Sequence, residues 1–324
     1  MSSEQNQHQT AVPVAYRALE AGPEALWDVA SAGGGGRQRS AFDQQGARRK
    51  LEYPPAPEPL PIAVMDNHTH LDMEDGNVAV SVKDALDAAE AVGICGAVQV
   101  GCDLASSRFT VAVLNDEPRL LGAVALHPNE APLLAARGGL EDALGEIEKL
   151  AAHPRVRAIG ETGLDYFRTA AEGLQRQQDS FRRHIDIARR LGLALQIHDR
   201  DAHDDVVRVL GEEALPEKVV FHCFSGGPEL ARICNENGWY MSFAGTSTFR
   251  NAGAIREALT VADLALMLVE TDAPFLTPHP FRGKPNASYM VPYTVRAMAE
   301  TLNVDLAELC SRLRSNTEAV YGIW

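Results

Sequence analysis

The chain has 324 residues, of which 45% are apolar and 23% are charged, and its net charge at neutral pH is −14. This composition is typical of a globular protein, and the length fits one large domain or two ordinary ones. The acidic balance excludes a protein that coats long stretches of nucleic acid with a basic surface. It does not exclude an enzyme that acts on nucleic acid, because a bound divalent cation supplies positive charge locally.

The sequence gives no indication of export or of membrane insertion. No apolar run approaches the roughly 18 residues that a membrane helix needs, and the first 20 residues lack the charged start and apolar core of a secretory signal. The five cysteines include no CxxC pair, so we expect them to be reduced. We expect a cytoplasmic protein without a membrane partner, present as a monomer or weak oligomer.

Residues 1–60 differ from the rest of the chain in composition and in apolar patterning. They contain the stretches SAGGGGRQRS and YPPAPEPLP, and they show no sustained apolar period. This composition is typical of an N-terminal extension that is mostly irregular or mobile. Residues 15–30 are an exception, because their spaced apolar side chains and a tryptophan indicate a short docked helix. Residues 61–324 are expected to form a single regular domain.

From residue 62 onward, short apolar runs rich in β-branched residues alternate with amphipathic stretches. The clearest helical pattern covers 174–192, where Phe181, Ile185 and Ala188 share one face and Gly192 ends the pattern. The predicted strands are 62–68, 93–101, 120–128, 156–164, 193–199, 218–225, 239–245 and 266–274. Eight such repeats predict an α/β fold, a (β/α)8 TIM barrel with eight parallel strands. A doubly wound open sheet is the alternative, although no GxGxxG or GxxxxGK[ST] motif supports a nucleotide-binding version.

Several predicted strands change abruptly at their carboxyl ends from apolar residues to metal-ligand types. These residues are His68, His70, His127, Glu161, Asp165, His198, His222 and Asp272. In a barrel all these ends meet on one face, where the active sites of this fold lie. A single histidine at a strand end is more often structural, but alternation along a strand places His68 and His70 on the same side. The whole set on one rim indicates a metal centre, because a metal offsets the cost of burying the carboxylates.

The ligand types narrow the chemistry. Imidazole and carboxylate without an obvious thiolate fit Zn²⁺, Mn²⁺, Mg²⁺, Co²⁺ or Fe²⁺. Six candidate ligands from this set are too many for one catalytic ion, so we expect two ions. We expect Glu161 to bridge them and Asp272 to accept a proton from the activated water. We expect Asp66 to orient a histidine ring and Asp72 to cap a turn. Cys223 faces away from the predicted site, and no GxSxG motif suggests a covalent nucleophile.

The chain resembles the TatD family of metal-dependent hydrolases and deoxyribonucleases, which are amidohydrolase-like barrels. The similar stretches are DNHTHLD (66–72), ALHPNEA (125–131), IGETGLDYFR (159–168), LQIHDRDAHDD (195–205), VFHCFSGG (220–227) and ETDAPFLTPHPFRGKPN (270–286). The resemblance covers residues 62–324 and leaves out the first 60. It departs from the family pattern at Ser288, where we expect a proline.

The resemblance implies metal ligation by His68, His70, Glu161, His198, His222 and Asp272. It also implies that His127, Arg282 and Lys284 lie near the substrate and contact phosphate. The implied activity is 3′→5′ exonuclease cleavage of DNA, possibly RNA, with two divalent ions such as Mg²⁺, Zn²⁺ or Mn²⁺.

Two other functions fit the same residues. Related barrels use the same ions on amides and esters, so an aminoacyl-RNA deacylase is the main alternative. A metal-holding scaffold with little turnover, interacting through the N-terminal extension, is the second, and the intact ligand set argues against it.

Overall fold

Eight parallel strands form the sheet at the centre of the fold in this computed structural model, which describes residues 11–17, 37–42 and 46–324. Their order is β10-β9-β8-β7-β6-β5-β4-β2, so each strand pairs with its neighbour along the chain. The two outer strands also meet, since Thr69 bridges to Ala273 and the Asn67 side chain donates to the carbonyl of Val269 at 2.8 Å. The sheet is therefore a (β/α)8 TIM barrel, and the alternative of an open doubly wound sheet was wrong.

All eight predicted strands are present, most of them a few residues shorter than expected. Their bounds are β2 Val64–Thr69, β4 Ile94–Val100, β5 Leu120–Val124, β6 Val156–Asp165, β7 Ala194–Arg200, β8 Val219–Phe221, β9 Tyr240–Phe243 and β10 Met267–Val269. Nearly every strand residue is buried, on both faces. This explains the continuous apolar runs, because one face of each strand fills the barrel and the other is covered by helices.

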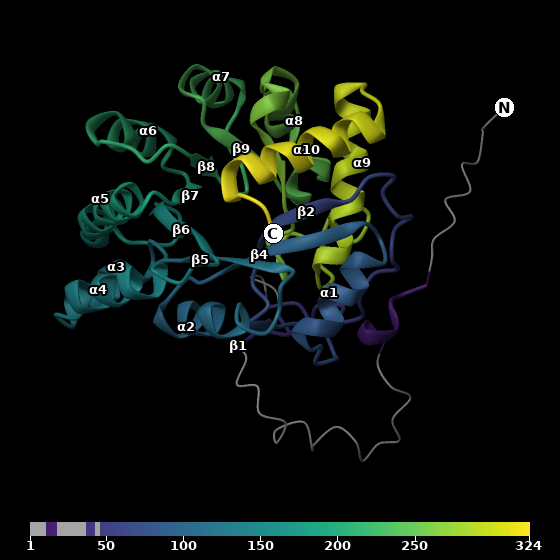
Figure 1. Cartoon of the computed structure of the whole chain (residues 1–324), viewed down its shortest axis with the longest axis horizontal. Helices are drawn as coiled ribbons and strands as arrows, with labels where there is room; N and C mark the ends of the chain where they lie inside the picture. Colours follow the sequence, from purple (N-terminus) through teal and green to yellow (C-terminus); the bar gives the residue numbers. More distant parts are fainter. Residues whose placement is uncertain (1–10, 18–36, 43–45) are drawn as a thin grey trace, which may run out of the picture.

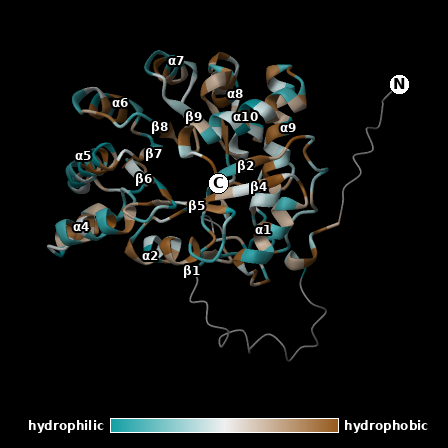
Figure 2. Ribbon diagram, in the orientation of Figure 1, coloured by the Kyte–Doolittle hydropathy of each residue, from teal (hydrophilic) through white to brown (hydrophobic). Residues whose placement is uncertain are grey.

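The helices surround the barrel (Figure 1). They are α1 Val82–Glu90, α2 Leu104–Val113, α3 Glu130–Ala136, α4 Leu140–Ala151, α5 Leu174–Leu191, α6 His203–Glu212, α7 Pro228–Asn237, α8 Gly253–Val261, α9 Val291–Leu302 and α10 Leu306–Tyr321. Short 3₁₀ turns are η1 Val14–Tyr16, η3 Ala171–Gly173, η4 Gly245–Thr248, η5 Leu264–Leu266 and η6 Ser288–Met290. Figure 2 shows hydrophobic and hydrophilic residues alternating along the helices, as amphipathic helices packed on a barrel require. Helix α5 ends as predicted, with Gly192 in the left-handed conformation (φ 65°).

The barrel interior is packed with side chains and is not a channel. Small and branched residues fill it, among them Val98, Leu121 and Leu268, all fully buried. Tyr321 and Trp324 at the C-terminus pack against this interior, and the Trp324 indole donates to the carbonyl of Arg119 at 2.8 Å. The predicted metal-ligand residues stand at the rim where the strands end.

The described parts of the N-terminal extension pack on the barrel. Tyr16 and Tyr53 are buried and contact each other, and the ring of Tyr16 lies 5.0 Å from that of Tyr289. The two-residue strand β1 (Arg37–Gln38) pairs with β3 (Met73–Glu74), which follows the first barrel strand. Of the helix predicted at 15–30, the structure describes only residues 15–17. Residues 15 and 16 lie in the 3₁₀ turn η1, and Arg17 follows it. The domain boundary at residue 60 stays a prediction.

A buried carboxylate joins this extension to the barrel. The Asp75 side chain is 1% exposed, and Arg49, 5% exposed, binds both its oxygens at 2.9 and 2.6 Å. Arg39 adds a third contact at 3.1 Å. Burial of an ionised carboxylate is costly unless it is paired, so Asp75 depends on arginines that both come from the extension.

We expect Arg49→Ala to lower the free energy of unfolding by about 3–5 kcal/mol, because it leaves the buried Asp75 carboxylate without its bidentate partner. Urea unfolding measures the change. The neighbouring exposed Arg48→Ala is the control and should stay within about 0.5 kcal/mol of the unmodified protein. Equal stability of the two variants would contradict a structural role for the Arg49–Asp75 pair.

Candidate metal centre

The structure brings seven predicted site residues together at the carboxyl ends of the strands. They come from β2, β6 and β7 and from the loops after β2, β5, β8 and β10, and they are His68, His70, His127, Glu161, His198, His222 and Asp272. All seven are linked by side-chain distances of 4.0 Å or less, His127 through its 3.9 Å distance to Glu161. The convergence predicted from the strand ends is therefore present.

One group of ligand atoms forms around His68, His70 and Asp272. The Nε2 atoms of the two histidines lie 3.3 Å apart, and Asp272 Oδ1 lies 3.3 Å from His70 Nε2 and 4.0 Å from His68 Nε2. The other nitrogen of His70 bonds the carbonyl of Val100 at 3.0 Å, which directs Nε2 toward Asp272. We call these three residues the first group.

A second group lies beside the first and consists of His198 and His222. Their facing nitrogens, Nδ1 and Nε2 respectively, are 3.4 Å apart. Glu161 joins the two groups, because its Oε1 lies 3.6 Å from His70 Nε2 while its Oε2 lies 2.8 Å from His222 Nε2 and 3.1 Å from His198 Nδ1. One carboxylate thus presents one oxygen to each group.

The charges of the centre fit divalent cations. Burial opposes ionisation of Glu161, but the surrounding imidazoles outweigh it and hold the pKa of this carboxyl well below its usual range. Burial lowers the pKa of His68 well below the usual value, so this ring is neutral, as a metal ligand must be. The buried His68 Nδ1 has no hydrogen-bond partner among the described residues.

Two other rings show that the centre attracts positive charge. Burial acts to lower the pKa of His222, yet Glu161 and Glu270 raise it to about 10. Burial also opposes protonation of His70, but Cys102, Asp272 and Glu161 raise its pKa well above the usual value. In the protein alone the carboxylates therefore draw protons onto imidazoles, and a cation can take the place of those protons.

Local backbone conformation delivers these side chains. Gly163 follows Glu161 on β6 with φ 137°, and a Cβ there would overlap the carbonyl oxygen of His198, so only glycine lets β7 approach this closely. Asp272 itself adopts a left-handed conformation (φ 53°), which aspartate tolerates better than most residues. The chain turns sharply there, and the carboxylate faces His70.

Asp66 does not orient a histidine ring, so that prediction was wrong. Its carboxylate accepts from the backbone of His68 at 3.3 Å and from the backbone and hydroxyl of Thr271 at 2.8 and 2.6 Å. It therefore ties β2 to the end of β10, at the closure of the barrel. Glu270 has the role expected of Asp66, because its Oε1 lies 3.3 Å from His222 Nδ1 and accepts from the Cys223 amide at 2.7 Å.

The cap expected of Asp72 is not among the hydrogen bonds of the described residues, and its carboxylate has side-chain partners instead. It accepts from the Arg37 side chain of the extension at 3.0 Å and from Gln99 at 3.2 Å.

Asp165 belongs to a third cluster with His127 and His198, and its Oδ2 lies 3.4 Å from His198 Nε2. Asp165 stands at a strand end like the other residues of the centre, so the pattern that located them also located it.

Arg282 and Lys284 are the two predicted site residues that the structure does not join to this cluster. Among the described residues, Arg282 stacks on the ring of Phe249 at 4.3 Å and bonds Asn251 at 3.3 Å. Phe249 follows η4, and Arg282 lies in the loop after β10, so both loops leave the carboxyl ends of strands. The arginine is therefore on the same face of the barrel as the metal centre.

The comparisons with known proteins agree with this geometry. A sequence profile of the TatD-related DNases matches residues 65–322. The chain belongs to the TatD-related DNase family. It is 42% identical over 264 residues to the metal-dependent hydrolase TatD of Mycobacterium tuberculosis, covering 80% of this chain and 98% of that protein. It is also 34% identical to the metal-dependent hydrolase YabD of Bacillus subtilis, over 80% of this chain and 99% of the relative.

A solved structure shows the same fold. The TatD homologue YjjV of Escherichia coli superposes with a TM-score of 0.74 over 81% of this chain and 98% of its own, at 24% identity. The protein is thus a TatD-family metal-dependent hydrolase with a TIM barrel. None of the helices in the described part of the chain is long and apolar enough to cross a membrane.

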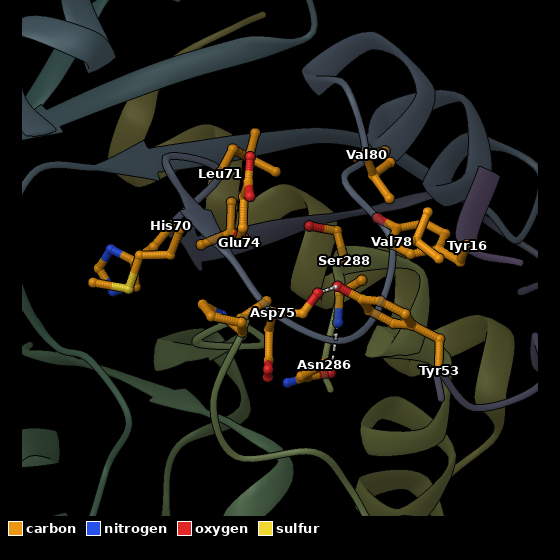
Figure 3. Close-up of a pocket in the computed structure, with 16 residues that line it drawn as sticks. Tyr16, Tyr53, His70, Leu71, Glu74, Asp75, Val78, Val80, Asn286 and Ser288 are labelled. Carbon is orange, nitrogen blue, oxygen red and sulfur yellow. Dashed lines mark hydrogen bonds between the residues drawn. The ribbon is translucent and has the colours of Figure 1, made fainter. Parts of the chain in front are cut away.

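The extension reaches the edge of the metal centre of this TatD-family protein. A small cavity of about 50 Å³ has Tyr16 and Tyr53 at one end and His70 at the other (Figure 3). Arg39 lies 4.7 Å from the ring of Phe275 and donates to the carbonyl of Pro274 at 2.6 Å, two residues after Asp272. The family profile starts at residue 65, so these contacts come from a part of the chain outside it.

We expect Glu270→Gln to weaken divalent-ion binding at the second group by about 10–100-fold, because the ring of His222 loses the carboxylate that orients it. Calorimetric titration of metal-free protein measures the affinity. The same change at the exposed Glu257 of α8 is the control. If both variants bind ions like the unmodified protein, Glu270 does not support His222.

Proposed function

We propose that this protein is a divalent-metal-dependent phosphodiesterase that shortens DNA stepwise from its 3′ end. Membership of the TatD-related DNase family supports the nucleic-acid substrate. The observation that carries the mechanism is the position of Glu161, which offers one oxygen to each of two neighbouring ligand groups. A bridging carboxylate of this kind is what a pair of ions needs.

In this proposal the first group, His68, His70 and Asp272, holds one ion. His198 and His222 would hold the other, and Glu161 would offer an oxygen to each. Divalent ions bound there supply an activated water and neutralise charge on the phosphate. Mg²⁺, Zn²⁺ and Mn²⁺ are the ions to test, because imidazole and carboxylate ligands accept all three.

Asp272 is the proton acceptor in this mechanism. Its side chain is 16% exposed, whereas that of Glu161 is 7% exposed, so solvent reaches Asp272 more readily. Its Oδ1 faces the first group, 3.3 Å from His70 Nε2, where it could accept a proton from a water activated by an ion held there. A carboxylate at this position would take the proton of the attacking water as the new phosphorus–oxygen bond forms and the bond from phosphorus to the leaving strand breaks.

His127 donates a hydrogen bond to the phosphate. Burial lowers its pKa to about 3, so the ring is neutral. Its Nδ1 accepts the amide hydrogen of Asn129 at 3.1 Å, which places the single ring proton on Nε2. Nε2 faces the centre, 3.9 Å from Glu161 Oε2, and is available to a phosphate oxygen.

We expect Asp272→Asn to lower kcat about 10²–10⁴-fold, because the amide cannot accept the proton. The assay follows 5′-end-labelled single-stranded DNA in protein reconstituted with Mg²⁺, Mn²⁺ or Zn²⁺, and EDTA should abolish stepwise shortening. Exposed Asp116→Asn is the matched control. Intact DNA together with release of the amino acid from an aminoacyl-RNA would overturn the phosphodiester assignment in favour of acyl hydrolysis.

Arg282→Ala and Lys284→Ala should raise KM for DNA and leave kcat nearly unchanged, because both side chains contact phosphates away from the reacting bond. Each lost contact should reduce the slope of log affinity against log salt by roughly 0.7 for a single strand. The exposed Arg176→Ala on α5 is the control. Unchanged KM and salt slope in both variants would place the DNA strand elsewhere.

A further inference from the structure

One more strand end carries a metal-ligand side chain that the predicted set left out. Strand β4 ends at Val100, and Cys102 follows two residues later. The Cys102 side chain is buried, with the residue 8% exposed, and it faces the metal centre. It therefore occupies on β4 the place that the histidines and carboxylates of the centre occupy on their own strands.

Cys102 forms a cluster with His70 and Glu161. Its Sγ lies 3.1 Å from Glu161 Oε1, and one ligand atom from each of the three residues lies within 4.8 Å of the others. Its 3.6 Å contact with His70 is to Nδ1, the nitrogen that bonds the Val100 carbonyl, and not to the Nε2 that faces Asp272. The Glu161 oxygen that it touches is the one facing the first group. The thiol is therefore at the edge of that group, beside the shared carboxylate.

The backbone holds this thiol in place. The Cys102 amide donates to Ser106 Oγ at 2.9 Å, and its carbonyl accepts from the His127 amide at 2.8 Å. Asp103 caps helix α2 immediately afterwards. Burial raises the pKa of the Cys102 thiol to about 12, so in the protein alone the group is an S–H that donates to Glu161 Oε1.

We infer that Cys102 is a thiolate ligand to the ion of the first group, and that it makes this position favour a thiophilic ion such as Zn²⁺ over Mg²⁺. The inference rests on the metal-binding part of the proposed function and not on its substrate. On ligation the S–H bond breaks, a sulfur–metal bond forms and the proton passes to the buffer; nothing is oxidised or reduced. Thiolate is a soft ligand, and soft ligands select Zn²⁺ over hard ions such as Mg²⁺.

Cys223 is a suitable comparison. It also stands at a strand end, directly after His222, and its amide donates to Glu270 at 2.7 Å. The clusters of ligand-type side chains among the described residues include Cys102 but not Cys223. Cys223 is therefore a cysteine near the centre that the inference does not involve, and it serves as a control.

The test is a titration of the metal-free full-length protein with Co²⁺, which reports on its ligands by absorption. A sulfur-to-cobalt charge-transfer band in the near ultraviolet is expected for the unmodified protein and for Cys223→Ser. Cys102→Ser and Cys102→Ala should still bind Co²⁺ without that band. In competition titrations they should lose Zn²⁺ affinity by at least about tenfold and keep their Mg²⁺ affinity.

The spectrum of the unmodified protein can overturn the inference by itself, so the inference stays testable even if a variant fails to fold. Co²⁺ binding without the band would overturn it and leave the proposed function standing, with Cys102 only a hydrogen-bond donor to Glu161. A band that persists in Cys102→Ala would also overturn it. No binding of any divalent ion would overturn both the inference and the proposed function.

Discussion

The metal centre depends on the burial of one charged carboxylate. Glu161 lies on β6 at the mouth of the barrel, where a negative charge is stable only with compensation. Within the protein that compensation comes from His70, His198 and His222, which are carried by three other strand ends. The positions of the histidines follow from this need, because each must bring a ring nitrogen to the same two oxygens. A TIM barrel makes this possible by directing distant parts of the chain to one rim.

The strand ends could be predicted from sequence because they combine two independent signals. Each strand is a short apolar run, and each run stops at a residue that is costly to bury. For His68 and His70 the alternation of a strand places both rings on one side, and the structure has their Nε2 atoms 3.3 Å apart. Where the helical period of apolar residues was strong, as in α5, the predicted helix bounds were correct to within a residue.

The residues that support the ligands could not be predicted in the same way. Asp66 was expected to orient a ring, and it instead holds the backbone of Thr271, whereas Glu270 faces His222. Both are buried acids within two residues of a ligand, so sequence alone does not distinguish them. Cys102 was overlooked for another reason. Most buried cysteines act as small apolar residues, and only histidines and acidic residues at the strand ends were taken as candidate ligands.

The arginines of the N-terminal extension make this region hard for the protein to lose. The family profile starts at residue 65, yet Asp75, inside it, is neutralised by Arg39 and Arg49, which lie outside. A chain cut at the start of the family profile would keep Asp75 and lose both of its arginine partners at once. The start of the family profile is thus not a point at which this chain can be divided without leaving a buried carboxylate unpaired.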